Sequence, residues 1–296
     1  MLLVIDIGNT NTVIGVYKGD KLTEHWRLET KKERTSDECG ILLKELFQFS
    51  NLSFKDIDGV VVSSVVPPLD FAIDRMCQRY LKLTPLHINQ SSKSPIKIKI
   101  DHPNELGADR IVNATAGFKN YGGPLIIVDF GTATTFDYIN EKGEYRGGLI
   151  TPGIAISNEA LFENASKLPH VEIKKPKRVV GRNTIESVQA GVYYGYVGLV
   201  DEIIRRMISE IGGKKPKVIA TGGFTSLIVP ESKTIQKADA FLTLDGLKIL
   251  WEMTDLVNPI PKFISIIDEN AQETKYYFSW NLLKIEKWLS TTTNKK

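Results

Sequence analysis

Residues 2–16, LLVIDIGNTNTVIGV, place a carboxylate and a short polar turn between two runs of apolar, largely β-branched residues. The first run stops at Asp6, the turn contains Gly8, and the second run starts near Val13. This pattern predicts two β-strands joined by a tight polar turn. An ordinary hairpin would explain the stretch by itself, so its meaning depends on the rest of the chain.

The same pattern recurs in the second half of the chain. Residues 125–137, LIIVDFGTATTFD, again give an apolar run, an aspartate, a glycine and small polar residues before a second strand. Aligning Asp6 with Asp129 also aligns Gly8 with Gly131 and Thr12 with Thr135. The repeat predicts a duplicated βββαβα unit, with an α/β lobe over 1–117, a second over 118–254, and a central cleft between them.

The remaining elements follow from apolar spacing. In the first lobe we expect strands over 2–8, 11–19, 21–30 and 59–66, a helix from about Ser36 as N-cap, a helix after Pro67, and a short strand over 85–89. In the second lobe we expect a third strand after the turn at Gly143, helices from about Gly153 and over 184–211, a strand over 216–223, and a final helix over 244–253.

The composition is typical of a soluble globular protein. Hydrophobic residues make up 42% and charged residues 25% of the 296 residues, and the net charge is +3. This charge calls for neither a nucleic-acid nor a membrane partner, and we expect neither. The N-terminal apolar run is short and lacks basic residues, so it does not resemble a signal peptide. Cys39 and Cys77 are expected as buried thiols, which fits a cytoplasmic location.

Two turns of the Asp-x-Gly type that face one cleft can hold a polyphosphate. Glycine lets the backbone approach the ligand, N–H groups bind the phosphate oxygens, and an aspartate holds a hydrated cation. The sequence contains no P-loop motif, no G-x-S-x-G and no G-x-G-x-x-G, and its four histidines have no metal-ligand spacing.

These motifs resemble a known family. The segments 6–12, 129–137 and 220–223 are similar to the phosphate-1, phosphate-2 and adenosine motifs of the actin-like ATPase (ribonuclease H-like) superfamily of sugar kinases, Hsp70 and actin. More narrowly, DIGNTNTVIGV, SSVVPPL, HPNELGADRIVNA, DFGTATTFD, GGLITPGI and GRNTIESVQAGVYYG resemble type III pantothenate kinases, from Met1 to about Met253. The resemblance implies phosphorylation of pantothenate by ATP, the first step toward coenzyme A.

The resemblance also implies roles for individual residues. Asp6 would face Mg²⁺ and the phosphates, and Asp129 would hold a monovalent cation, K⁺ or NH₄⁺. Asp109 would be the catalytic base. The residues expected at the ATP phosphates are Asp6, Ile7, Gly8, Asn9, Thr10, Asn11, Thr12, Val13, Gly131 and Thr132. Those expected at pantothenate are Gly107, Ala108, Asp109, Arg110, Thr184 and Ile100.

Several of these residues have simpler explanations. Asp109 in a first helical turn stabilises the helix N-terminus without any catalytic role. Arg110 could bind the carboxylate of pantothenate or pair with Glu105. Thr132 could bond to backbone as a strand-end hydroxyl. The N-cap of the helix over 184–211 could be Asn183 or Thr184, and capping alone would explain Thr184.

Two features depart from the family pattern. Ile100 stands where the family usually has a tyrosine that lines the pantothenate pocket, which favours an apolar contact or another small hydroxy-acid as acceptor. Residues 255–296 extend beyond the usual end of the family, with a linker at Pro259 and Pro261 and an aromatic-rich helix expected over 276–289. The family further implies a homodimer. A non-catalytic nucleotide-binding regulator or transcription accessory protein is the alternative, but the presence of Asp109 argues against it.

Overall fold

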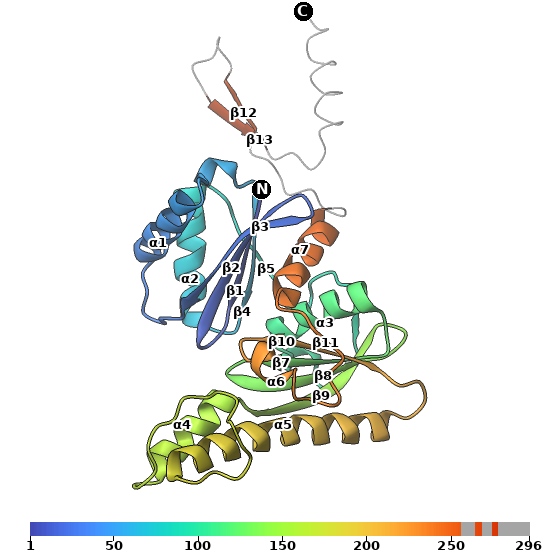
Figure 1. Ribbon diagram of the computed structural model, residues 1–296. Helices are drawn as coiled ribbons and strands as arrows, with labels where there is room; N and C mark the ends of the chain where they lie inside the picture. Colours follow the sequence, from blue (N-terminus) through green and yellow to red (C-terminus); the bar gives the residue numbers. More distant parts are fainter. Residues whose placement is uncertain (256–263, 268–273, 278–296) are drawn as a thin grey trace, which may run out of the picture. The chain divides into compact units, whose positions relative to one another are not determined.

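The computed structural model describes residues 1–255, 264–267 and 274–277 (Figure 1). It divides the chain into two compact units, Met1–Leu250 and Trp251–Lys296. In the second unit, β12 (Ile264–Ile267) and β13 (Thr274–Tyr277) form an antiparallel pair. Most of the expected aromatic helix and the proline linker lie outside the described residues, and the first two residues of that helix, Tyr276 and Tyr277, lie in β13 instead.

The first unit contains two mixed sheets. The first has the order β3-β2-β1-β4-β5, and the second has the order β11-β10-β7-β8-β9-β6. In the first sheet β1 pairs antiparallel with β2 and parallel with β4, and in the second sheet β7 pairs antiparallel with β8 and parallel with β10. The short strand β6 precedes β7 in sequence and pairs with β9 at the edge of the second sheet. The strands are β1 (Leu2–Ile7), β2 (Asn11–Lys18), β3 (Lys21–Glu29), β4 (Gly59–Ser64), β5 (Leu86–His87), β6 (Lys97–Ile98), β7 (Leu125–Phe130), β8 (Ala133–Ile139), β9 (Glu144–Pro152), β10 (Lys217–Gly222) and β11 (Lys237–Ala238).

The helices repeat in the same order around the two sheets. They are α1 (Ser36–Phe49), α2 (Pro67–Met76), α3 (Ala108–Tyr121), α4 (Ile154–Asn164), α5 (Thr184–Ile211), α6 (Thr225–Ile228) and α7 (Leu242–Asp255), with short turns at Phe54–Asp56, Cys77–Leu81 and Pro103–Glu105. With the second sheet counted from β7, one or two helices follow the third strand of each sheet, one follows the fourth, and one follows the fifth. The predicted duplication is therefore confirmed at the level of topology.

The register corrects one detail of the predicted alignment. Ile7 pairs with Thr12 in the first sheet, whereas its counterpart Phe130 pairs with Thr134 in the second. The second turn is thus one residue shorter than the first, and Thr134, not Thr135, occupies the place of Thr12. An alignment without a gap could not reveal this difference, because both positions are threonines.

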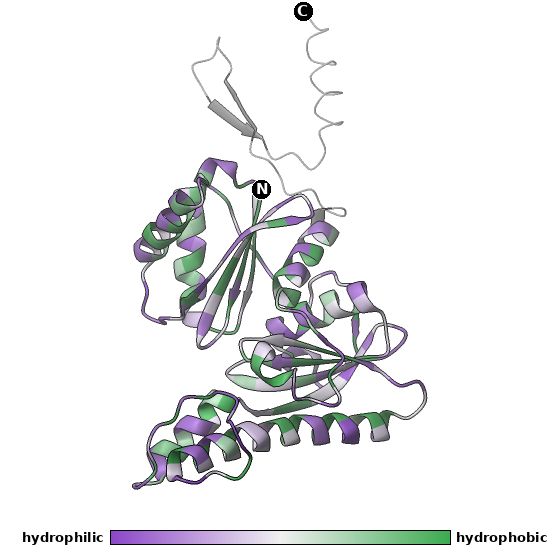
Figure 2. Cartoon of the chain, viewed as in Figure 1, coloured by the Kyte–Doolittle hydropathy of each residue, from purple (hydrophilic) through white to green (hydrophobic). Residues whose placement is uncertain are grey.

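Each sheet packs one of its faces against helices through a separate apolar core. In the first, Leu3, Ile5 and Val62 pack with Leu43 of α1 and Ile73 of α2. In Figure 2 this sheet shows green, hydrophobic strands at its centre and purple, hydrophilic segments toward its edge. In the second core, β7 and β10 pack against one face of α5, at Tyr193, Val197, Val200, Ile204 and Met207. This spacing of three and four residues is that of a single helical face, and the helix has the bounds that the sequence predicts.

Two helices, α3 and α7, each contact the sheet that belongs to the other lobe. α3 follows β5 of the first sheet, yet it contacts β7 and β8 of the second as well as β4. α7 follows β11 of the second sheet, yet Leu244 approaches Gly15 of β2, where an added Cβ would lie 3.0 Å from its Cδ1 atom. The boundary at 117/118 stays a prediction, and α3 lies across it with contacts to both sheets.

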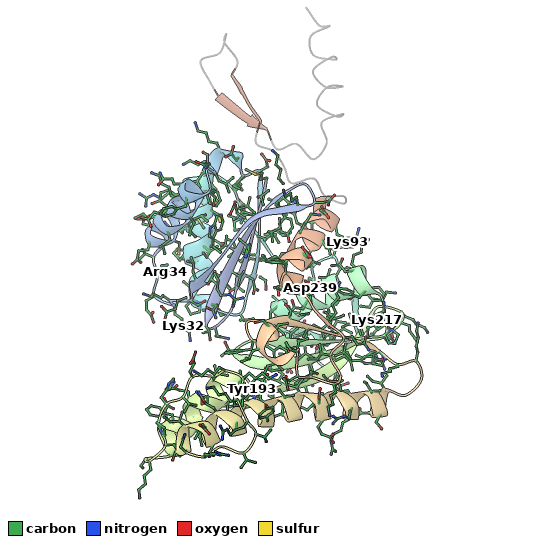
Figure 3. All side chains as sticks on the ribbon, in the orientation of Figure 1. Lys32, Arg34, Lys93, Tyr193, Lys217 and Asp239 are labelled. Atoms are coloured by element: carbon green, nitrogen blue, oxygen red, sulfur yellow. The ribbon has the colours of Figure 1, made fainter. Side chains whose placement is uncertain are left out.

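Side-chain hydrogen bonds support these crossings. Tyr17 of β2 donates to Asp245 of α7 at 2.5 Å. Tyr121 of α3 donates to Asp239, labelled in Figure 3, just before α7. Within residues 1–255, no helix combines the length and apolar character needed to cross a membrane.

Candidate active site

The two predicted phosphate turns meet in the structure. Thr10 Oγ1 and Thr132 Oγ1 lie 2.7 Å apart, although 122 positions separate them in the sequence. This contact answers the question about Thr132, because its hydroxyl bonds to the other turn and not only to backbone. Gly153 supports the second turn from behind: its N–H donates to Thr132 O at 3.0 Å, and an added Cβ would lie 2.4 Å from that oxygen.

The first turn is held by the end of β3. Gly8 N donates to Asn11 O at 3.0 Å, which closes the turn. Thr30 Oγ1 donates to Gly8 O at 2.7 Å, and Thr30 N donates to Thr10 O at 3.0 Å. These bonds fix the backbone from Gly8 to Asn11, so its remaining groups have a defined orientation toward the second turn.

Three carboxylates lie close enough to influence one another beside these turns. Burial, then Asp109 and Asp129, raises the pKa of Asp6 to about 7. Burial, then Asp109, raises the pKa of Asp129 to about 7 as well. Burial also raises the pKa of Asp109, while the Arg110 backbone N–H, which donates to Asp109 Oδ1 at 2.9 Å, opposes this shift. Such mutual repulsion is what a bound cation would relieve.

Asp109 occupies the place that the sequence predicts, in the first turn of α3. The N-cap of α3 is Gly107, and a Cβ at that position would lie 2.5 Å from Asp109 Oδ1. The glycine of the GADR segment therefore makes room for the carboxylate. The N-cap of α1 is Thr35, in a capping box with Glu38, and not Ser36 as expected; both residues carry a hydroxyl, and only the backbone conformation distinguishes them.

Arg110 pairs with Asp137 and not with Glu105. Its Nε atom donates to Asp137 Oδ1 at 2.7 Å, and Nη2 lies 2.6 Å from the same oxygen. Asp137 is fully buried on β8, where Tyr145 and Thr135 also donate to it. The sequence analysis missed Asp137, although an aspartate within an apolar strand signals that a buried partner is required.

Adjacent glycines on β9 lie near Arg110 and Ile100 respectively. A Cβ on Gly148 would lie 3.0 Å from Arg110 Nη2, and one on Gly147 would lie 4.0 Å from Ile100 Cγ2. Both of these predicted acceptor residues therefore lie near the same segment of β9, at neighbouring positions.

Thr184 lies apart from this group within the chain. It is the first residue of α5, and the N-cap is Asn183, whose side chain accepts from Glu186 N at 2.9 Å. Thr184 lines a cavity of about 760 Å³ between α4 and α5, together with Leu161, Leu168, Asn183 and Val188. Among the described residues, no hydrogen bond or ion pair joins Thr184 to Asp109 or Arg110.

The site also contains residues that the sequence analysis did not single out. Asn113 of α3 donates to Asp129 Oδ2 at 2.8 Å and accepts from Thr243 Oγ1 at 2.7 Å. Gly222, with φ of +95°, lies against Asp129, because an added Cβ would be 2.5 Å from Oδ1. The helical spacing of α3 could have placed Asn113 one turn after Asp109, on the same face.

Comparisons with known proteins agree on one family. The family model described as type III pantothenate kinase matches residues 2–206. The type III pantothenate kinase of Geobacter sulfurreducens is 56% identical over 252 residues, which cover 85% of this chain and 98% of that protein. The corresponding protein of Bacillus cytotoxicus is 55% identical over 252 residues, covering 85% of this chain and 96% of its own length.

A solved structure shares the fold at low sequence identity. A Campylobacter jejuni protein described as belonging to the Baf family of transcriptional activators superposes with a TM-score of 0.54 at 19% identity, covering 86% of this chain and all of that one. This likeness concerns the fold alone. The two sheets have the repeated topology that the sequence predicts. Since the family model spans more than half of the chain and two relatives exceed 50% identity over nearly their whole length, the chain belongs to the type III pantothenate kinase family.

Proposed function

We propose that the site where the two phosphate turns meet transfers the γ-phosphoryl group of Mg·ATP to the primary hydroxyl of pantothenate. The observation that carries this proposal, beyond family membership, is the contact between Thr10 and Thr132. It joins two turns of phosphate-binding type at one point, next to the carboxylates of Asp6, Asp109 and Asp129. Phosphoryl transfer depends mostly on positioning and on stabilisation of charge, which this arrangement can provide.

The two turns would hold the nucleotide. The backbone N–H groups and hydroxyls that face the phosphates would come from residues 6–13 in the first turn and from Gly131 and Thr132 in the second. Because Gly8 and Gly131 have no side chain, the backbone can approach the phosphate oxygens there. Asp6 would face the magnesium ion that enters with ATP.

The acidic residues fit a cation that is shared with the substrate. Among the described residues, no group of three or more His, Cys, Asp or Glu side chains is arranged to hold a metal by itself. A magnesium ion coordinated mainly by phosphates and water needs no such cage. Asp129, with Asn113 on one oxygen and Gly222 against the other, fits a monovalent cation, which would supply positive charge beside the phosphates.

Asp109 would act as the base. Its raised pKa makes the ionised carboxylate a better proton acceptor than an exposed aspartate, and the N-terminus of α3 favours the ionised form. The carboxylate would orient the hydroxyl of pantothenate and accept its proton as the phosphoryl group arrives.

Arg110 would bind the carboxylate of pantothenate. Its Nε and Nη2 atoms are engaged by Asp137, so the N–H groups on the remaining side of the guanidinium are available for a ligand. Gly107, Ala108 and the apolar Ile100 would line the same pocket. Because Asp137 balances the charge of Arg110, recognition would depend on the direction of the donors as well as on charge.

A homodimer in the cytoplasm completes the proposal. Thr184 would then act at the pantothenate pocket near the subunit interface. Apolar side chains are exposed on β9, α4 and α5, including Ile150 at 64% and Ile185 at 53%, which is the surface that a second copy could bury. Both described cysteines are free thiols, with Cys77 buried and Cys39 half-buried, which suits a reducing compartment.

An acceptor panel tests the proposed reaction. ADP formation by the full chain is measured with pantothenate, with the neutral analogue pantothenol and with other small hydroxy-acids. Pantothenate should give the highest kcat/KM. Higher kcat/KM with another hydroxy-acid would assign a different acceptor, and no acceptor-dependent ADP would refute the kinase.

Asp109→Asn tests the base in the same assay. It should lower kcat about a hundredfold or more, because base catalysis contributes that much. Asp101→Asn, in the exposed loop before α3, is the matched control and should retain the parent rate. An Asp109→Asn variant within about threefold of the parent would remove Asp109 from the role of base.

The monovalent-cation site is tested by measuring the parent protein in buffer without potassium or ammonium. Full activity in that buffer would contradict the site.

A further inference from the structure

An arginine on β3 lies beside the phosphate turns and has no role in the proposal above. Arg27 pairs with Val13 in the ladder of β3 with β2, at the end of the first turn. Three residues later, Thr30 bonds to Gly8 and to Thr10 through side chain and backbone. The strand that carries Arg27 is therefore fixed to the turn, and the position of Arg27 relative to the turn is fixed with it.

The Arg27 side chain extends from the first sheet to the second. A Cβ built on Gly223 would lie 3.5 Å from Arg27 Nη1. Gly223 follows Gly222, which lies against Asp129 at the end of β10. One guanidinium thus lies near the turns of both sheets, where the nucleotide would bind.

The charge of Arg27 acts on this site. Burial is the main cause that raises the pKa values of Asp6 and Asp129, and Arg27 opposes it at both residues. No ion pair or hydrogen bond engages the Arg27 guanidinium among the residues that the structure describes, and the side chain is exposed. A structural arginine would be expected to pair with a nearby carboxylate or to stack on an aromatic ring.

We propose that Arg27 binds the phosphate chain of the nucleotide and so links the first lobe to the turn at Gly222–Gly223 when ATP is bound. This inference rests on the nucleotide site proposed above. A guanidinium fork matches the geometry of phosphate oxygens, and its charge offsets the repulsion between a polyphosphate and the carboxylates nearby. A charged group between two lobes would also favour the arrangement in which both contact the same ligand.

Nucleotide binding without acceptor tests the proposal. Dissociation constants of ATP, ADP and adenosine are measured by calorimetry in the presence of magnesium for the full chain and for Arg27→Ala, Arg27→Gln and Arg27→Lys. Arg27→Ala and Arg27→Gln should weaken ATP and ADP about tenfold and leave adenosine unchanged, since only the phosphates meet the guanidinium. Arg27→Lys should recover part of the loss, because it keeps the charge and loses the fork.

Lys21→Ala is the matched control, because Lys21 is an exposed cation on the same strand at the hairpin end away from the turn. It should bind all three ligands as the parent does. Unchanged ADP affinity in Arg27→Gln, or an equal loss for adenosine, would overturn the role of Arg27 while leaving the nucleotide site in place. A parent protein that binds ADP no better than adenosine would overturn the nucleotide site and this inference together.

Discussion

At the residue scale, the buried carboxylate of Asp129 suits the proposed cation site but lowers the stability of the folded protein when no cation is bound. Its carboxyl ionises near 3.8 in an unfolded chain, whereas burial and the neighbouring Asp109 raise its pKa to about 7 in the folded protein. The folded state therefore holds the proton more tightly than the unfolded state. Linkage then requires this carboxyl to reduce stability as the pH rises from about 4 to 7, and the full penalty is present above that range.

Replacing this carboxyl should stabilise the cation-free protein. Asp129→Asn keeps an oxygen that can accept from Asn113 and removes the buried charge. We expect the variant to unfold at a higher denaturant concentration than the parent at pH 8, with the difference shrinking toward pH 5. Urea titrations without potassium, ammonium or divalent cations measure this. Parallel stability curves for the two proteins across this pH range would show that Asp129 carries no such penalty.

The pair of Arg110 and Asp137 allows a second test at this scale. Arg110→Ala should raise KM for pantothenate about tenfold or more and leave KM for ATP nearly unchanged, because a charge-assisted contact contributes about 1.5–3 kcal/mol. Asp137→Asn should shift the same constant in the same direction, since it releases the guanidinium from its orientation, and it should also destabilise the fold by about 3 kcal/mol because the arginine loses its buried partner.

Pantothenol separates recognition from packing. The neutral acceptor should be poor with the parent, and Arg110→Ala should close most of the gap between the two acceptors. If Asp137 acts through Arg110, the double variant Arg110→Ala/Asp137→Asn should have nearly the same KM for pantothenate as Arg110→Ala alone. Equal losses for both acceptors would mean that the guanidinium positions α3 or the phosphate and does not bind a carboxylate.

At the element scale, the start of α5 separates capping from binding. Asn183 caps the helix through Glu186 N, so Thr184 has no capping role. Asn183→Ala should lower the free energy of unfolding by about 1 kcal/mol. Thr184→Ala should leave it within about 0.5 kcal/mol and still raise KM for pantothenate. Thermal unfolding and kinetics of both variants decide the point, and a Thr184→Ala protein with parent kinetics would exclude Thr184 from the acceptor site.

The turns show why local sequence is informative at this scale. Gly19 and Gly143 adopt φ values of +58° and +75°, a region that glycine enters at little cost, and both hairpins form where the sequence predicts them. The helix caps were predicted to within one residue. Choosing between Thr35 and Ser36, or between Asn183 and Thr184, depends on backbone angles that adjacent polar residues do not determine.

At the scale of the whole molecule, the lobes are joined by the helices that cross between them. Tyr17 of β2 is almost fully buried and donates to Asp245 of α7, whose pKa is raised by burial and lowered by this bond. Removing the hydroxyl leaves a partly buried carboxylate without this donor. Such a contact should couple the stability of one lobe to the other.

A double-mutant cycle measures this coupling. Tyr17→Phe should reduce the free energy of unfolding by about 1–3 kcal/mol, because an acceptor loses its partner in a buried position. Asp245→Ala should cost a similar amount, and the double variant should cost less than the sum of the two. Additive losses would show that the bond between Tyr17 and Asp245 contributes nothing of its own.

The sequence by itself determined the elements, their repetition and the family. Strand and helix patterns depend on neighbouring residues, so β1, β7 and α5 could be located from apolar spacing, and the motifs around Asp6, Asp109 and Asp129 indicated the family to which the chain belongs. The chain order of α3 and α7 was also predictable, but their packing on the opposite lobe was not.

Only the tertiary structure decided which distant side chains meet. Arg110 pairs with Asp137 because β8 runs beside the start of α3, Thr10 meets Thr132 across the two turns, and Arg27 reaches Gly223 from the other sheet. Each of these contacts depends on strand register and on how the two sheets are placed, quantities set by packing over the whole unit. A one-residue difference in a turn, such as the one that places Thr134 opposite Phe130, changes which side chain faces the site and leaves the local pattern unaltered.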